Sequence, residues 1–442
     1  MTTPRQTPPG KGTDGAVSLG LKQRALIILV LTAALYGLIL TLFGPAYALR
    51  MTVEALCYAL IALGLNVQWG YAGLFNAGVM GFVALGAYLS LFVSFPVNEA
   101  FWQGDFPLRL GRVLLMGAGV IALTWLIARG NRLFGLPRRL STALAVIVGA
   151  VGYLVVMATL DPVARDIERQ AGFIGGLGLP VWLGWIAAGA AAGGLAWFVG
   201  RICLGLRSDY LAIATLGIAE IVKAVLKNAD WLTRGTLTVS PLPWPVPTPD
   251  TIGFIAARAA YLVLMAVLIV VVWWLLEKAW RAPWGRMMRA IRDNEIAAAA
   301  MGKDVNARRL QIFILGSGLM GVGGAALIGF TRIFDPAGFL PLNHTFLVWV
   351  MVILGGPGNN LGAIIGALIV YAVWVMSEPA ALALFHLLGE AGQTLFGLTL
   401  PADLDARALQ ARVFAIGLVI TLVLRYAPRG LLPEPRMLTR DT

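Results

Sequence analysis

Long apolar segments recur along almost the whole chain and constrain its fold more than any other feature. A helix needs about 20 apolar residues to cross the hydrocarbon core of a bilayer. Only 13% of the 442 residues are charged, about half of the fraction usual in soluble domains. Since the backbone in lipid must satisfy its own hydrogen bonds, each segment is expected to be a helix. The segments lie at about residues 25–43, 51–69, 71–93, 112–128, 141–159, 181–199, 210–227, 258–276, 310–330, 345–376 and 409–425.

Basic residues in the loops give these helices a direction, because loops rich in Lys and Arg stay on the cytoplasmic side. The loop 129–139 holds four arginines and no acid, and the loop 277–310 holds eight basic residues and four acids. Both are expected inside, whereas the acidic loop 161–170 and the Pro-rich stretch 240–249 are expected outside. Most of the net charge of +12 is explained by such loops, so nucleic-acid binding is not expected.

The sequence therefore predicts an all-α polytopic integral membrane protein with about 10–12 transmembrane helices, some of them broken at Gly-rich segments. Only Gly70 separates the second apolar segment from the third, which is too little for an ordinary turn. The segment 345–376 is interrupted by GGPGNN at 355–360, and we expect two shorter pieces there, since the C-terminal arginines then fall inside. The predicted parts are a disordered cytoplasmic tail at 1–23, a transmembrane domain at 24–430 and a cytoplasmic tail at 431–442.

The loop 277–310 has a helical pattern of its own. Trp284, Met287, Met288 and Ile291 recur at the spacing of an amphipathic helix. A second short helix is expected to begin at a cap formed by Asp293 or Asn294 and to end at Gly302. Such helices fit either an interfacial helix lying on the bilayer or a surface that docks on a partner.

Five separated motifs carry a family resemblance. AIRDNEIAAAAMG at 290–302 resembles the cytoplasmic coupling loop of ABC importer permeases, in the version of the branched-chain amino acid permease family, LivM-type. GYAGLFNAGVMGFVALGAY at 70–88, RSDYLAIATL at 207–216, LVWVMVILGGPGNNLGAIIGA at 347–367 and RGLL at 429–432 resemble other segments of that family. The resemblance covers about residues 50–432, and this chain departs from the family by inserts around 94–112, 129–180 and 377–409.

The resemblance implies an ABC importer permease fold whose loop 277–310 docks on an ATPase subunit. The residues implied in this coupling are Arg292, Asp293, Glu295, Ala298, Ala299 and Gly302. It also implies a second, similar permease subunit, two ATPase subunits and an extracytoplasmic binding protein, in a bacterial cytoplasmic membrane. The basic residues near both ends of the chain predict that both termini lie inside. ATP and Mg²⁺ would be used by the partner subunits, because this chain has no G-x-x-x-x-G-K-[ST] motif.

Small and polar residues within the apolar segments have two interpretations, close helix packing or a role in the translocation pathway. The candidates are Gly73, Asn76, Gly81, Thr215, Glu220, Gly355, Gly356, Gly358 and Asn359. Glu220, near the middle of its segment, is either functional or paired with Lys223 at i+3. Glu54, four residues after Arg50, is interpreted as an ordinary ion pair at a helix end.

Other functional classes have less support. An ion-coupled secondary carrier usually needs several buried acids, and the segments have few. The two cysteines and two histidines have no spacing typical of a metal site or a disulfide framework, and they form no catalytic constellation. No cofactor is expected on this chain. The predicted cargo is a branched-chain or related hydrophobic amino acid, with urea, short amides or aromatic acids as the alternative.

Overall fold

The computed structural model describes residues 21–130, 137–396 and 410–434, and within these ranges the regular elements are helices. The prediction of an all-α membrane fold is confirmed. The predicted tails at 1–23 and 431–442 lie largely outside the described residues, and the first helix begins at Leu21. The elements are α1 (Leu21–Phe43), α2 (Pro45–Leu65), η1 (Asn66–Tyr71), α3 (Val79–Ser94), α4 (Glu99–Trp102), α5 (Phe106–Ala128), α7 (Arg138–Gln170), α8 (Val181–Cys203), α9 (Ser208–Asn228), α10 (Asp230–Thr233), α11 (Pro249–Ile252), α12 (Phe254–Arg281), α13 (Pro283–Asp293), α14 (Glu295–Ala300), α15 (Val305–Thr331), η2 (Pro336–Gly338), α16 (Pro341–Gly355), α17 (Asn360–Phe396) and α19 (Ala411–Tyr426).

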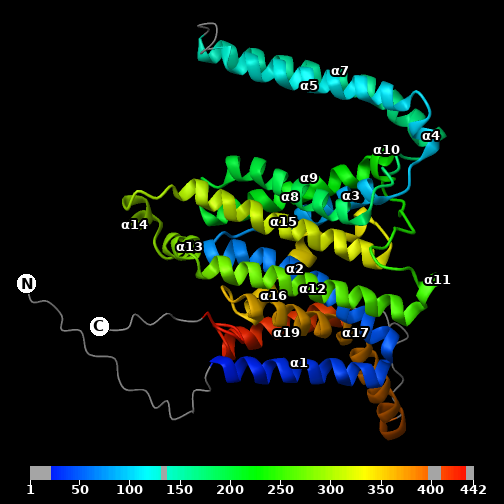
Figure 1. The fold of residues 1–442 in the computed structure, drawn as a ribbon, viewed down its shortest axis with the longest axis vertical. Coiled ribbons are helices and arrows are strands. Elements are labelled where there is room, and N and C mark those ends of the chain that lie inside the picture. The colour runs from blue at the N-terminus through cyan, green and yellow to red at the C-terminus, as the bar shows by residue number, and fades with distance from the viewer. Residues whose placement is uncertain (1–20, 131–136, 397–409, 435–442) are drawn as a thin grey trace, which may run out of the picture.

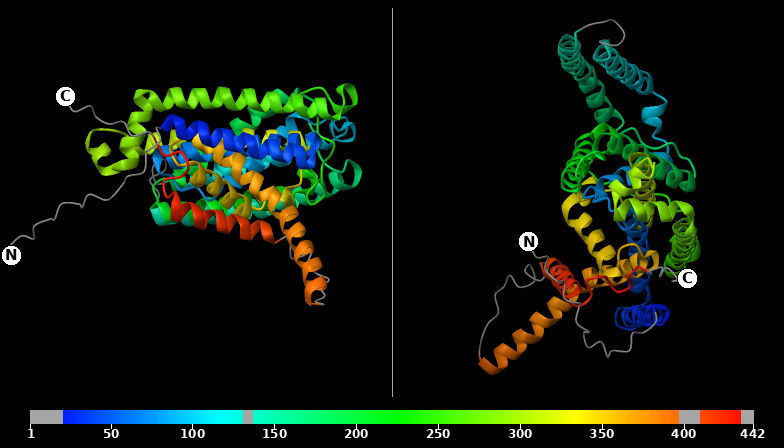
Figure 2. Two further views of the ribbon diagram at one scale, coloured as in Figure 1. Left: turned by 90° about the horizontal axis from the view of Figure 1, so that it is seen from below. Right: turned by 90° about the vertical axis from the view of Figure 1, so that its left-hand side faces the viewer.

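The long helices of the bundle run roughly side by side, which gives the molecule two distinct ends (Figure 1). The helices α13 and α14 project from one end, which we name the coupling end, as Figure 2 also shows in its left view. The short helices α4, α10 and α11 lie at the opposite end, which we name the far end. Among the described residues, eight helices are long and apolar enough to cross a membrane, and α3 and α16 are shorter apolar helices.

The core is formed where α15 packs against α2, α3 and α8. Close approach depends on glycine: a Cβ on Gly86 would lie 2.4 Å from the Cα atom of Gly321, and one on Gly321 would lie 2.6 Å from the Cβ atom of Ala192. Small residues of this kind let membrane helices come together backbone to backbone. Gly321 therefore permits the close packing of α15 against α3 and α8.

The two apolar segments that lack an ordinary turn, 51–93 and 345–376, are each interrupted by a stretch of non-helical backbone. The helix α2 continues into η1, a π-helical turn, and residues 73–78 then run without helix before α3 begins at Val79. The prediction that a helix begins at 71 is wrong, because apolar residues also fill this extended stretch and hydropathy does not distinguish the two conformations. The predicted break at 355–360 is confirmed, since α16 ends at Gly355 and α17 begins at Asn360.

The inserts around 94–112 and 129–180 contribute to two neighbouring helices, α5 and α7. These helices pack mainly on each other and are mostly exposed, and in Figure 1 they stand apart from the bundle except near α4 and α10. The predicted outer loop at 161–170 is instead the last part of α7. Polar residues lower the hydropathy there without ending the helix.

Candidate functional site

The coupling loop folds into the two helices that the sequence predicts. In α13, Met288 and Ile291 of the apolar stripe are buried. The cap of α14 is Asn294 rather than Asp293, because its Oδ1 accepts a hydrogen bond from the Ala297 amide at 3.0 Å. Gly302 follows the end of the helix with φ of 74°, a left-handed conformation that favours glycine.

The surface of α14 differs from the expected one. Ala298 is only 7% exposed and faces the rest of the chain, whereas Ala299 is exposed. The residues that project outward are Ile296 and Met301, which are 82% and 79% exposed. Sequence reasoning missed both, although two large apolar residues flanking the four alanines are the signal that could have found them. Two large apolar side chains are therefore uncovered on the outer side of α14.

Two arginines connect the coupling loop to the helix bundle through ion pairs and a hydrogen bond. Arg309 of α15 makes a two-pronged ion pair with Glu295, its Nη1 and Nη2 each 2.7 Å from a carboxylate oxygen. Arg292 donates from Nη1 to the carbonyl oxygen of Gly70 in η1, and its Nη2 lies 2.9 Å from Oε2 of Glu434. These contacts connect α13 and α14 to α15, to η1 and to the C-terminal segment.

Hydrogen bonds also connect η1 to residues 355–360, where the chain breaks between α16 and α17. Asn66 accepts a hydrogen bond from the Gly358 amide at 2.8 Å and donates to Asn360 Oδ1 at 3.1 Å. The hydroxyl of Tyr71 donates to the same Asn360 oxygen at 2.8 Å. A Cβ on Gly70 would lie 2.4 Å from the Gly358 nitrogen, so the two backbones approach as closely as glycine allows.

The C-terminal segment completes this arrangement. The amides of Leu431 and Leu432 donate to the carbonyl oxygens of Leu354 and Gly355 at 2.7 and 3.0 Å. Gly356 has φ of 111° beneath them, and the side chain of Asn359 caps α17 by accepting from the Gly362 amide. We name the set formed by η1, residues 355–360, Arg292 and residues 431–434 the coupling junction. It brings together residues from four of the five motifs, which lie far apart in the sequence.

The remaining candidates hold the loop 73–78 in place. Asn76 donates to Gln68 Oε1 at 2.8 Å, and its carbonyl oxygen accepts from Trp349 Nε1 at 3.0 Å. Thr215 of α9 accepts a hydrogen bond from the Ala77 amide. Gly73 lies beside Arg292, and Gly81 packs against Ala219 of α9. These residues tie the loop to α9 and α16.

Glu220 does not form the predicted local ion pair. The helix α9 packs mainly on α3 through Leu211, Thr215 and Ala219. Glu220 lies on its exposed face, and in the described part of the chain no ion pair joins it to Lys223. The interpretation as a local pair with Lys223 is therefore wrong, and Glu220 points outward because the buried stripe of α9 passes one residue away from it.

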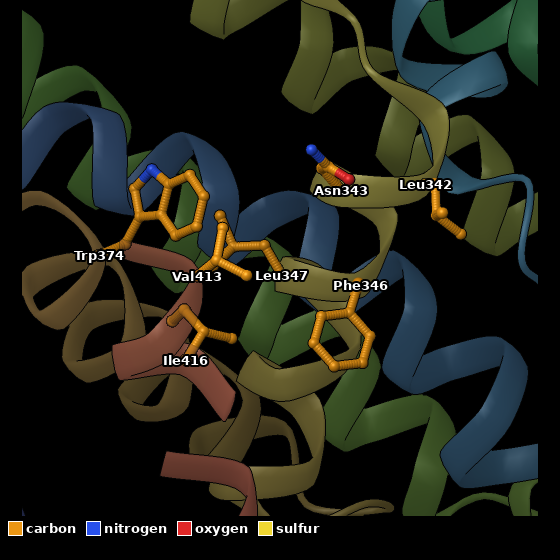
Figure 3. Close-up of a pocket in the computed structure, with 7 residues that line it drawn as sticks. All are labelled: Leu342, Asn343, Phe346, Leu347, Trp374, Val413 and Ile416. Carbon is orange, nitrogen blue, oxygen red and sulfur yellow. The ribbon is translucent and has the colours of Figure 1, made fainter. Parts of the chain in front are cut away.

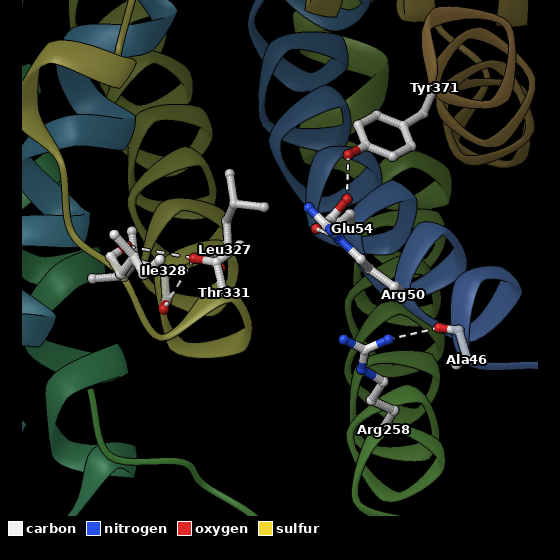
Figure 4. A network of polar contacts seen from close by, with 9 residues as sticks. Ala46, Arg50, Glu54, Arg258, Leu327, Ile328, Thr331 and Tyr371 are labelled. Atoms are coloured by element: carbon white, nitrogen blue, oxygen red, sulfur yellow. Dashed lines mark hydrogen bonds and ion pairs between the residues drawn. The ribbon is translucent and has the colours of Figure 1, made fainter. Parts of the chain in front are cut away.

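Glu54 is more deeply placed than its sequence position suggested. Since α2 begins at Pro45, Glu54 lies well inside the helix and is buried. Its Oε1 accepts from Arg50 Nε at 3.0 Å, and its Oε2 accepts from the Tyr371 hydroxyl at 2.6 Å (Figure 4). Nearby, Arg258 of α12 donates to the Ala46 carbonyl oxygen.

Two neighbouring cavities differ in lining. One of about 310 Å³ lies between α16, α17 and α19 and is lined by Leu342, Asn343, Phe346, Leu347, Trp374, Val413 and Ile416 (Figure 3). Its described lining has no charged side chain to anchor a polar cargo. The other, of about 410 Å³, is lined in part by Arg50, Glu54, Asp335 and His344.

Comparison with known proteins decides the family. The model of the branched-chain amino acid transport system / permease component family matches residues 47–400. The chain belongs to this family. It is a multi-pass membrane protein of the ABC importer permease type; permeases of this type are not catalytic themselves and imply ATPase and binding-protein partners.

Individual relatives agree with this assignment. A probable branched-chain amino acid permease LivM of Methanocaldococcus jannaschii is 25% identical over 86% of this chain and 92% of its own length. The high-affinity branched-chain amino acid permease LivM of Escherichia coli is 24% identical over 75% of this chain and 65% of its own length. An autoinducer 2 import permease, LsrC of Klebsiella pneumoniae, is 29% identical over 51% of the chain. No solved structure matches the chain significantly.

Proposed function

We propose that this permease translocates branched-chain amino acids, delivered by an extracytoplasmic binding protein, across a bacterial cytoplasmic membrane. Its partners are a second, similar permease subunit and two ATPase subunits that use ATP and Mg²⁺. The coupling end faces the cytoplasm, as do both termini. The cargo assignment is supported by the two LivM relatives, which match most of this chain.

The observation that carries the mechanism is the position of Arg292. This one side chain joins the coupling loop to η1 and to Glu434, and η1 is bonded to the break between α16 and α17. Broken helices of this kind change their direction at the break with little loss of hydrogen bonds, because their ends are satisfied by side chains. ATP-driven movement of α14 therefore reorients α16 and α17 through the coupling junction, and the permease alternates between outward and inward access.

The exposed face of α9 supports a paired permease. A carboxylate at the centre of a membrane helix that faces lipid costs about 2.5–3.5 kcal/mol on insertion scales. Glu220 on that face is favourable only beside water or a polar partner. We assign this face to the contact with the second permease subunit, where it lines the translocation pathway.

The test is ATP-driven uptake by the complete transporter in proteoliposomes, with its binding protein on the outside. Leucine, isoleucine and valine are compared with urea, acetamide, phenylalanine and a monosaccharide. We expect accumulation of the three branched-chain amino acids that stops without ATP. Uptake of the monosaccharide or of urea in their place contradicts the assignment of cargo, and uptake that follows an ion gradient without ATP contradicts the mechanism.

A further inference from the structure

The cavity at the far end combines charges of both signs with an apolar wall. It has a volume of about 410 Å³, and its charged lining consists of Arg50, Glu54 and Asp335. Arg50 and Glu54 come from α2, and Asp335 comes from the segment after α15. The apolar part of the lining includes Ile61, Met80, Val83, Leu327, Ile328 and Phe339.

Arg50 is held so that it can bind a carboxylate. Its Nε is bonded to Glu54, whose second oxygen is fixed by the Tyr371 hydroxyl. The Arg50 side chain is nevertheless 59% exposed, and no hydrogen bond of its Nη1 and Nη2 to another described residue is present. A guanidinium offers five N–H donors in a planar fork that matches the two oxygens of a carboxylate. The bond to Glu54 therefore leaves free the two nitrogens best suited to this geometry.

Asp335 supplies a complementary negative charge. Its Oδ1 accepts from the Ala337 amide at 2.8 Å, and Oδ2 accepts no hydrogen bond from the described residues. A carboxylate oxygen with unused lone pairs is a natural acceptor for an ammonium group. The cavity is thus lined by the Arg50 guanidinium with its paired Glu54 carboxylate, by the Asp335 carboxylate from a different element, and by apolar side chains.

We propose that this cavity is a binding site for an α-amino acid with an apolar side chain. Arg50 binds the carboxylate, Asp335 accepts from the ammonium group, and the side chain lies along Ile61, Met80 and Ile328. The proposal rests on the proposed function, because it identifies where within a single permease chain the amino acid is held. This cavity is separate from the exposed face of α9. The proposal therefore places a site that receives the amino acid at the far end of the bundle.

Protection of a reporter cysteine tests this site directly. Ile333 lines the cavity and is exposed, so Ile333→Cys is introduced into a chain whose two native, buried cysteines are replaced by alanine. The complete transporter in lipid nanodiscs is labelled with a membrane-impermeant maleimide. The probes are leucine, 4-methylpentanoate and isoamylamine, which share a branched aliphatic group. Leucine carries both a carboxylate and an ammonium group, 4-methylpentanoate only the carboxylate, and isoamylamine only the ammonium group. Leu237→Cys, on an exposed loop outside the lining, is the control reporter.

We expect saturating leucine to slow labelling of Ile333→Cys at least fivefold, with little effect from the single-charge probes and none at the control. Arg50→Gln and Asp335→Asn, added one at a time, each raise the leucine concentration for half-protection at least tenfold. Equal protection by all three probes overturns the proposal, because the cavity then binds only an apolar group. Absence of leucine protection in a transporter that accumulates leucine also overturns it while leaving the proposed function intact. Leucine protection in a transporter that accumulates no branched-chain amino acid supports the site and contradicts the function.

Discussion

The substitution Ile296→Ala tests whether α14 docks on an ATPase subunit. Ile296 is 82% exposed in the isolated chain, and the substitution removes three side-chain carbons. At about 0.8 kcal/mol per buried carbon, and scaled by the exposed fraction, the lost transfer free energy is roughly 2 kcal/mol. Since each 1.4 kcal/mol corresponds to a factor of ten, the Kd for the ATPase subunit should rise by about 30-fold. Folding of the permease should be unaffected, because the side chain makes few contacts within the chain.

The assay is the equilibrium binding of purified ATPase subunit to the permease in nanodiscs, immobilised through the far end. Leu237→Ala is the matched control, since Leu237 is also an exposed aliphatic residue but lies on the loop after α10. The control should bind as the wild type does. If Ile296→Ala binds the ATPase subunit with unchanged affinity, α14 does not dock through this surface and the loop is an interfacial helix.

Three further predictions concern topology, packing and the pathway. A cysteine at Ala299 should react with a membrane-impermeant thiol reagent only from the cytoplasmic side, and labelling from outside in intact cells would reverse the proposed orientation. Gly321→Leu should reduce the stability of the purified transporter by about 1–3 kcal/mol through overpacking, as measured by thermal unfolding. The control Gly194→Leu, at a position facing open space, should have little effect. Equal stability of both variants would contradict the packing account. Glu220→Leu should preserve assembly with the ATPase subunits and lower amino acid uptake severalfold, and unchanged uptake would remove this residue from the pathway.

Features set by neighbouring residues could be predicted from the sequence. The two helices of the coupling loop follow from an apolar stripe, an Asn cap and a terminal glycine. The break at 355–360 follows from glycines and a proline within an apolar segment. In each case the determining interactions lie within a few residues of one another, so a local pattern contains the necessary information.

The coupling junction could not be predicted, because its bonds join residues far apart in the chain. The contact between Arg292 and Gly70 spans 222 positions, and that between Asn66 and Gly358 spans 292. Only the packed bundle brings them together.

Glu54 was misjudged for a different reason. The apolar run of the sequence begins after Arg50, which predicts Glu54 at a helix end. The helix begins earlier, at Pro45, where proline is favoured in the first turn. Hydropathy reports where a chain meets lipid and not where its helix starts, so an acid buried within α2 appeared to be terminal. For the same reason, the low hydropathy of residues 161–170 predicts a loop where α7 continues as a helix.

The role of Arg292 as the link between ATP hydrolysis and transport is the central claim, and Arg292→Gln tests it most directly. The variant keeps a polar side chain, but it is shorter than arginine and lacks the charge that pairs with Glu434. Ile296 and Met301 remain available for docking. The measurement is leucine uptake and ATP hydrolysis recorded together in proteoliposomes containing the complete transporter. We predict that ATP hydrolysis persists with bound ATPase subunits while uptake falls at least tenfold, so that the ratio of leucine transported to ATP hydrolysed collapses. An unchanged ratio would contradict the account, because the coupling junction would then carry no part of the movement.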